Sequence, residues 1–235
     1  MDSIIEKYDL LIDRLAKFIK TIGYSDSLEL SYLLSYLINN GYLSNNKSFS
    51  KGEIKNEIDT RLGTSIICGT GCCRNFSSIH KNLFDKLDVY DKYLYCYQGF
   101  GKGLNRKANH VINLINYANN YYGIDIYNYN KIYRFQNEYL LKEISLYTGS
   151  KLVHKPFYEL ENGISNLDEI LEFINMLKKS SLSKYINEYD YDIIKYEIMN
   201  KIKQKNNSYE DFYIENQSLI KSINNEMEVL YERCI

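Results

Sequence analysis

Three cysteines occur within six residues in the segment ICGTGCCRN. The last of them, Cys73, follows a glycine-rich turn and precedes a stretch, residues 74–87, with the apolar spacing of a helix. The amino end of a helix carries partial positive charge and free N–H groups, which lower the pKa of a thiol and can stabilise an oxyanion. We therefore expect a thiol of this cluster, at the start of the helix, to be a nucleophile with a backbone N–H as an oxyanion donor.

A thiolate in an enzyme needs a base or a cationic partner, and His110 is the candidate for that role. It begins the apolar run HVINLINY, which is typical of a buried strand. A second strand-like run, YYGIDI, occupies residues 121–126, and the residues Ala118-Asn119-Asn120 before it favour a turn. The pattern predicts a β-hairpin that begins at His110.

The register of this hairpin decides whether an acidic residue can orient His110. With a two-residue turn, Tyr117 pairs with Asn120. Counting back along both strands, His110 then pairs with Tyr127, and Asp125 lies two positions from that partner on the same face of the sheet. An odd loop length or a bulge would move Asp125 to the other face. The residues therefore predict a Cys–His–Asp triad, provided that the turn is of even length.

Three segments of the chain resemble a known family. GCCRNFS at 71–77, NHVINLI at 109–115 and YYGID at 121–125 are together similar to the transglutaminase-like superfamily of papain-like cysteine enzymes. That family has a Cys at a helix amino end, a His on a strand and an Asp on the neighbouring strand, in this chain order. The resemblance covers roughly residues 60–130.

The resemblance implies a role for each of the three residues. Cys73, rather than Cys72, matches the family pattern G-x-C and is implied to be the nucleophile, with His110 as the base and Asp125 as the orienting acid. The chain departs from the family in lacking the Trp often found near the His. It also has Ile67 six positions before the nucleophile, where papain has a side-chain oxyanion donor, so the second donor is unassigned.

The implied reaction is attack of the thiol on a peptide or carboxamide carbonyl to give a thioester, with no metal or organic cofactor. Resemblance to small bacterial transglutaminase-like proteins favours hydrolysis. The leading hypothesis is therefore a cysteine amidase or peptidase that acts on a protein or peptide substrate. A protein-glutamine transglutaminase or a deamidase would use the same triad. A catalytically inactive interaction module is the alternative from another class.

Residues outside the triad give weaker signals. Lys102, Arg106 and Asn109 precede the predicted strand and are candidates for substrate binding at the rim of a cleft. The glycine-rich loop at 99–103 lacks the following helix that a nucleotide-binding loop requires. His80 is expected to be a hydrogen-bonded core or surface histidine. A zinc site made of His80 and the clustered cysteines is disfavoured, because the paired C-x-x-C spacing is absent.

Composition excludes several other classes. The chain has 235 residues and a net charge of −1, so it shows no overall electrostatic signature of nucleic-acid or anionic-membrane binding. No run approaches the ~20 apolar residues of a membrane helix, and the first residues do not resemble a signal peptide, so a cytoplasmic protein is expected. Tyr is abundant (25 residues) and Trp absent, which we attribute to a biased genome.

The spacing of apolar residues predicts the elements that surround the site. Helices are expected over 1–23 and 25–41, in a short segment after Ser50, and again from about residue 131 to the end of the chain, with starts near 165, 184 and 208. The fold class is therefore α+β, with a papain/transglutaminase-like core between two helical extensions. Its three parts are the N-terminal helical region 1–62, the catalytic core 63–130 and the C-terminal helical extension 131–235.

Overall fold

The structure is a computed structural model of the whole chain, which describes residues 2–45, 50–51, 63–96, 110–117, 120–128, 131–134 and 188–232. The helix expected near residue 165 and the candidate substrate residues Lys102, Arg106 and Asn109 lie outside these ranges.

Two helices begin the chain, as predicted: α1 (Asp2–Ile22) and α2 (Ser27–Asn39). The start of α2 is set by Asp26, whose carboxylate accepts the Glu29 N–H at 2.8 Å. Glu29 in turn accepts the Ser25 N–H at 3.0 Å. These bonds satisfy N–H groups that would otherwise lack an acceptor at the start of the helix.

A four-stranded antiparallel sheet has the order β3-β4-β5-β6. Tyr117 pairs with Asn120, so the predicted hairpin and its two-residue turn are confirmed. The strands are β3 (Asp91–Cys96), β4 (His110–Tyr117), β5 (Asn120–Asp125) and β6 (Lys131–Arg134).

Three details of the sequence prediction were wrong. The chain does not turn helical at residue 131, because Lys131–Arg134 adds strand β6 to the edge of the sheet. His110 does not pair with Tyr127, because β5 ends at Asp125 and Ile126–Asn128 forms the 3₁₀ helix η1. Ser50, expected to cap a helix, instead lies in the short strand β1 (Ser50–Lys51), and the helix expected after it lies outside the described residues.

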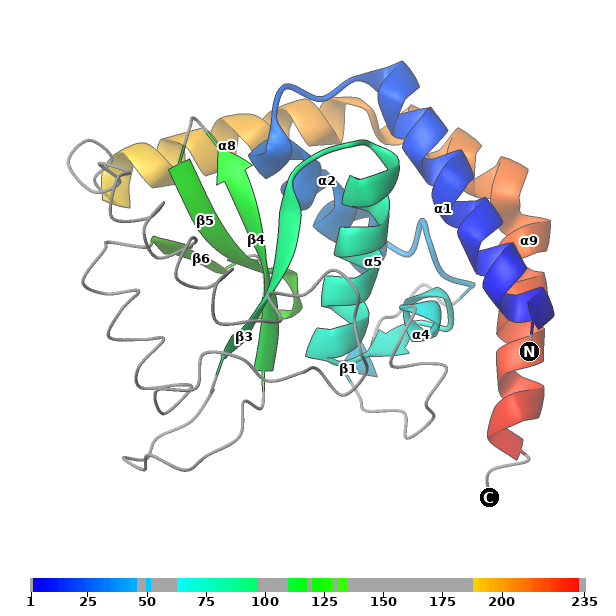
Figure 1. The fold of residues 1–235 in the computed structure, drawn as a ribbon. Coiled ribbons are helices and arrows are strands. Elements are labelled where there is room, and N and C mark those ends of the chain that lie inside the picture. The colour runs from blue at the N-terminus through cyan, green and yellow to red at the C-terminus, as the bar shows by residue number, and fades with distance from the viewer. Residues whose placement is uncertain are drawn as a thin grey trace, which may run out of the picture.

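Strand β1 pairs in parallel with β2 (Thr70–Gly71), which lies between two helices, α4 (Thr64–Ile67) and α5 (Cys73–Lys86). Helix α5 packs against β3 and β4 and lies near the centre of the molecule (Figure 1). Its inward residues include Phe76, Ile79, Leu83 and Phe84, all at most 2% exposed. The observed start and end of α5 agree with the predicted helix to within one residue.

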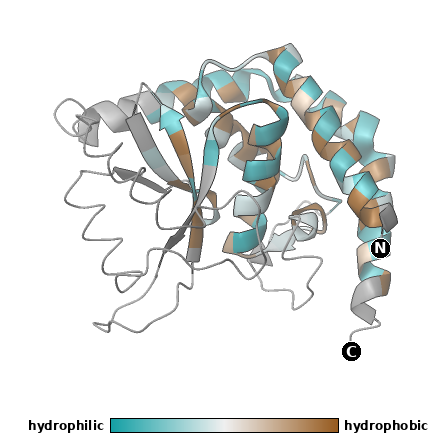
Figure 2. Cartoon of the chain, in the orientation of Figure 1, coloured by the Kyte–Doolittle hydropathy of each residue, from teal (hydrophilic) through white to brown (hydrophobic). Residues whose placement is uncertain are grey.

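Two long helices follow in the C-terminal part, α8 (Glu188–Gln204) and α9 (Asn206–Glu232). Helix α9 runs antiparallel to α1 along one side of the molecule (Figure 1), since Lys7 pairs with Glu226 near one end and Lys205 donates to the Ile22 carbonyl at 3.0 Å near the other. Hydrophobic and hydrophilic residues alternate along both helices (Figure 2), as expected where each buries one face.

The described part of the chain is therefore a mostly helical α+β fold with one continuous hydrophobic core. Residues of α1, α2, α5, the sheet and α9 all contribute to this core. None of the described helices combines the length and the apolar composition of a membrane-spanning segment.

Candidate active site

Cys73 is the first residue of α5, so the prediction that it begins a helix is confirmed. Cys72 is the N-cap, with extended backbone angles (φ −113°, ψ −177°). The side-chain oxygen of Asn75 accepts the Cys72 N–H at 2.9 Å, which fixes the entry of the chain into the helix. Both thiols are free and half-buried.

The Cys73 sulfur lies against the start of strand β4. The Val111 backbone N–H donates a hydrogen bond to it, and this contact lowers the pKa of Cys73. The neighbouring Cys72 has the larger, opposite effect: its hydrogen bond and negative charge, together with burial, hold the pKa of Cys73 above the ordinary thiol value. Val111 follows His110 directly, so Cys73 lies beside the strand that carries the predicted base.

Cys72 is the more acidic thiol of the pair. The Cys73 S–H donates to the Cys72 sulfur, and the Arg74 side chain and backbone N–H add further hydrogen bonds, so the pKa of Cys72 falls to about 5 although burial opposes the shift. The contact between the two sulfurs therefore favours the thiolate of Cys72 over that of Cys73. The sequence gives no sign of this effect, because nothing in the order of residues reveals the contact between the two sulfurs.

His110 and Asp125 lie at the same end of the sheet. His110 is the first residue of β4 and pairs with Cys96 on β3, whereas Asp125 is the last residue of β5 and pairs with Lys131. Continuing the observed β4–β5 register by one residue brings Asp125 opposite Ile112, on the face that His110 shares. Asp125 is 1% exposed. The fold thus brings the backbones of all three predicted triad residues to one region, while the direction of the His110 side chain lies outside the described structure.

The first N–H groups of α5 are not all available to a substrate. The Cys72 N–H is bound by Asn75, and the Arg74 N–H lies against the Cys72 sulfur. The first N–H groups of a helix have no acceptor within that helix. The Cys73 N–H is therefore the candidate backbone donor to the oxyanion that would form if the Cys73 sulfur attacked a carbonyl carbon.

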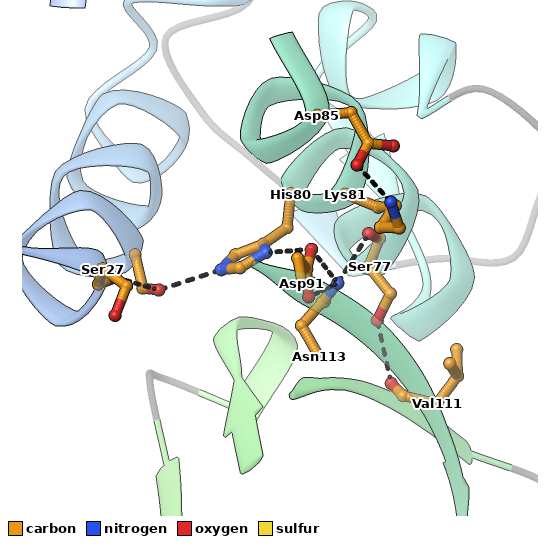
Figure 3. A network of polar contacts seen from close by, with 9 residues as sticks. Ser27, Ser77, His80, Lys81, Asp85, Asp91, Val111 and Asn113 are labelled. Atoms are coloured by element: carbon orange, nitrogen blue, oxygen red, sulfur yellow. Dashed lines mark hydrogen bonds and ion pairs between the residues drawn. The ribbon is translucent and has the colours of Figure 1, made fainter. Parts of the chain in front are cut away.

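A second polar cluster lies deeper in the core, one to two turns along α5 (Figure 3). His80 Nδ1 lies 2.9 Å from Asp91 Oδ2, and His80 Nε2 lies 2.9 Å from Ser31 Oγ. Asn113 Nδ2 donates to the Asp91 carboxylate at 2.9 Å. The prediction that His80 is a hydrogen-bonded core histidine is confirmed, since its side chain is fully buried.

This Ser–His–Asp arrangement is structural rather than catalytic. Ser31 Oγ donates its only hydrogen to the Ser27 carbonyl at 2.9 Å, so it accepts a hydrogen bond from His80 and has no proton to give it. Ser31 is 1% exposed, and a substrate could not reach it. Desolvation raises the pKa of Asp91, against the opposing effect of His80. A hydrogen bond joins Asp91 to His80, and the cluster connects α2, α5, β3 and β4.

Sequence reasoning did not single out Asn113 or Ser77 as polar core residues. Ser77 Oγ donates to the Val111 carbonyl at 3.1 Å, and Asn113 Nδ2 donates to the Ser77 carbonyl at 3.1 Å. The available signal was their position, since Asn113 interrupts an apolar strand and Ser77 adjoins Phe76 on a helix. Within the described residues, no group of three His, Cys, Asp or Glu side chains is placed to hold a metal ion.

Compared with protein-family models, with curated proteins and with solved structures, the chain matches none of them.

Proposed function

We propose that this protein is a cysteine-dependent amidase or peptidase with a papain/transglutaminase-like core, and that Cys73, His110 and Asp125 form its triad. The observation that supports this most directly is the contact between the Cys73 sulfur and the N–H of Val111, the residue after His110. The thiol at the amino end of α5 therefore lies beside the first residues of strand β4, which begins with the proposed base. Asp125, buried on the neighbouring strand, is in register to orient that base.

In the proposed reaction, the Cys73 proton passes to His110, or across the S–H···S hydrogen bond to Cys72, and leaves a thiolate. The thiolate attacks the carbonyl carbon of an amide, and the developing oxyanion accepts a hydrogen bond from the Cys73 N–H. Collapse of this intermediate breaks the C–N bond, and the proton taken from Cys73, held on His110 as imidazolium or delivered to it from Cys72, passes to the departing amine. Water, activated by the neutral imidazole, then attacks the thioester carbonyl, releases the acid and returns the proton to the thiol.

The choice of Cys73 over Cys72 follows from position, not from acidity. The Cys72 sulfur is surrounded by the side chain and backbone N–H of Arg74, whereas the Cys73 sulfur contacts β4. Only Cys73 therefore lies beside the strand of the proposed base. Cys72 serves as an acceptor that can hold the proton removed from its neighbour.

The first test measures alkylation of Cys73 by iodoacetamide near neutral pH, read by peptide mass spectrometry. Because proton transfer to His110 is proposed to outweigh the pKa-raising effect of Cys72, the wild type should react faster at this position than a free thiol does, and His110→Ala should slow the reaction. Cys72→Ser is the matched control and should leave Cys73 reactive. If Cys73 in the wild type reacts no faster than a free thiol, and His110→Ala leaves its rate unchanged, the proposed triad is wrong.

The second test identifies the group that accepts the acyl enzyme. The protein is incubated with a glutamine-rich protein and a fluorescent primary amine. Cleavage of the chain supports the peptidase, and release of ammonia alone indicates a deamidase. Incorporation of the amine indicates a transglutaminase and contradicts hydrolysis as the main reaction.

A further inference from the structure

Val111 lies just beyond the end of the ladder between β4 and β5, whose last pair is Asn113 and Ile124. In an antiparallel hairpin closed by a two-residue turn, hydrogen-bonded pairs recur at every second residue, starting here from Tyr117 and Asn120. The same spacing would pair Val111 with Ile126. Ile126 instead begins the 3₁₀ helix η1, so the ladder does not provide partners for the Val111 peptide groups.

Helix α5 provides these partners. The Val111 N–H donates to the Cys73 sulfur, and the Val111 carbonyl accepts a hydrogen bond from Ser77 Oγ at 3.1 Å. Cys73 and Ser77 are four residues apart, and side chains at that spacing lie on the same face of a helix. One helix face therefore holds the two peptide groups of Val111 with two side chains, one of which is the proposed nucleophile.

Ser77 is itself fixed by the buried cluster. Asn113 Nδ2 donates to the Ser77 carbonyl at 3.1 Å and to the Asp91 carboxylate, which also binds His80 (Figure 3). Ser77 is 3% exposed and Asn113 is fully buried. Two side-chain bonds therefore connect the helix and the strand. The Ser77 side chain donates to a backbone carbonyl of β4, and the Asn113 side chain donates to a backbone carbonyl of α5. This pair of bonds restricts sliding of α5 along β4.

We propose that Ser77, held by Asn113, is a positioning residue that keeps the Val111 N–H against the Cys73 sulfur and so stabilises the thiolate. The inference rests on the proposed function in that it assigns Cys73 as the reactive thiol. Ser77 does not touch the substrate in this scheme. It acts through Val111, which neighbours His110, and so also sets the spacing between the nucleophile and its base.

The test measures the pH dependence of Cys73 alkylation in a Cys72→Ser background, so that the Cys73 thiol titrates without its neighbour. Ser77→Ala should move the midpoint of the alkylation profile to higher pH, because the Val111 N–H is no longer held in place. One hydrogen bond corresponds to a rate lower by about three- to tenfold at neutral pH. Ser77→Thr retains the hydroxyl and should restore the profile.

Two controls separate positioning from general loss of stability. Ser78→Ala removes a hydroxyl that is equally buried on the same helix, and Ser31→Ala removes one at the far end of the cluster. Both are expected to lower the melting temperature without moving the profile. Asn113→Ser removes the hydrogen bond to the Ser77 carbonyl but keeps the Ser77 hydroxyl. It should move the alkylation midpoint in the same direction as Ser77→Ala, by a smaller amount, and it serves as the test if Ser77→Ala does not fold.

The proposal is overturned if Ser77→Ala and Ser78→Ala give the same profile, or if Ser77→Thr fails to restore it at an unchanged melting temperature. Failure of the proposed triad gives a different result. In that case His110→Ala leaves the alkylation profile unchanged, whatever the Ser77 variants do.

Discussion

The buried carboxylate of Asp91 allows a quantitative prediction for the stability of the fold. Asp91 Oδ2 lies 2.9 Å from His80 Nδ1 and accepts a hydrogen bond from Asn113 Nδ2 at 2.9 Å, and both partners are fully buried. Asp91→Ala leaves these two buried groups without this partner, at a cost of about 1–3 kcal/mol each. Loss of one member of a buried ionisable pair costs about 3–5 kcal/mol in other proteins. We therefore expect the free energy of unfolding to fall by about 4 kcal/mol.

The assay is urea unfolding followed by circular dichroism, with the melting temperature as a second measurement. For a chain of this size, a loss of about 4 kcal/mol corresponds to a melting temperature lower by about 8–16 °C. Asp13→Ala is the matched control, because the Asp13 carboxylate is 54% exposed and pairs with the exposed Lys86. It should cost less than about 1 kcal/mol.

A double variant tests whether the cost comes from the unpaired donors. Asp91→Leu with His80→Phe removes both members of the pair and keeps their approximate volume. It should be less destabilising than the sum of the two single variants, since fewer buried polar groups are left unpaired. A cost below about 1 kcal/mol for Asp91→Ala, equal to that of Asp13→Ala, would refute the reasoning.

Two further predictions concern the acidic thiol. Arg74→Gln should raise the pH midpoint of Cys72 alkylation above about pH 5, because a cationic hydrogen-bond donor to the thiolate is lost. Peptide mass spectrometry across a pH series measures this midpoint. An unchanged midpoint would contradict the role of Arg74 in lowering the pKa of Cys72. The folded-state pKa of Cys72 lies below its unfolded value of 9.0, so its thiolate adds stability that is present above pH 9 and is lost as pH falls towards 5. Cys72→Ser should therefore reduce the rise of the unfolding free energy with pH between these two values, as measured by urea unfolding at several pH values. An unchanged dependence of the unfolding free energy on pH would show that Cys72 does not cause this rise.

The elements around the site were predictable where a local pattern and a turn agreed. The start of α5 at Cys73 follows from a glycine-rich turn before apolar residues at helical spacing. The hairpin register is the one predicted for a two-residue turn, in which Tyr117 pairs with Asn120 and the strands alternate with a period of two. These two results place the backbones of the proposed nucleophile and base.

Other features depend on contacts that no local pattern contains. Strand β6 has only the residues Lys131–Arg134, and it is a strand because β5 offers it an edge. Ser50 has the sequence of a helix cap, yet it pairs with Thr70, a distant partner. The S–H···S hydrogen bond of Cys72 and the cluster at His80 likewise depend on side chains brought together by folding. Tertiary contacts override local propensity in these places.

The antiparallel pairing of α1 with α9 also constrains the order of folding. Tyr8, Leu11 and Leu15 on α1 share a buried cluster with Ile220 and Ile223 on α9. During synthesis, the apolar face of α1 leaves the ribosome long before α9 exists to cover it. Contacts of such large sequence separation slow folding and leave hydrophobic surface exposed in the meantime. Cys72 and Cys73, at the start of α5, are therefore attached to a core that cannot close until α9 has emerged.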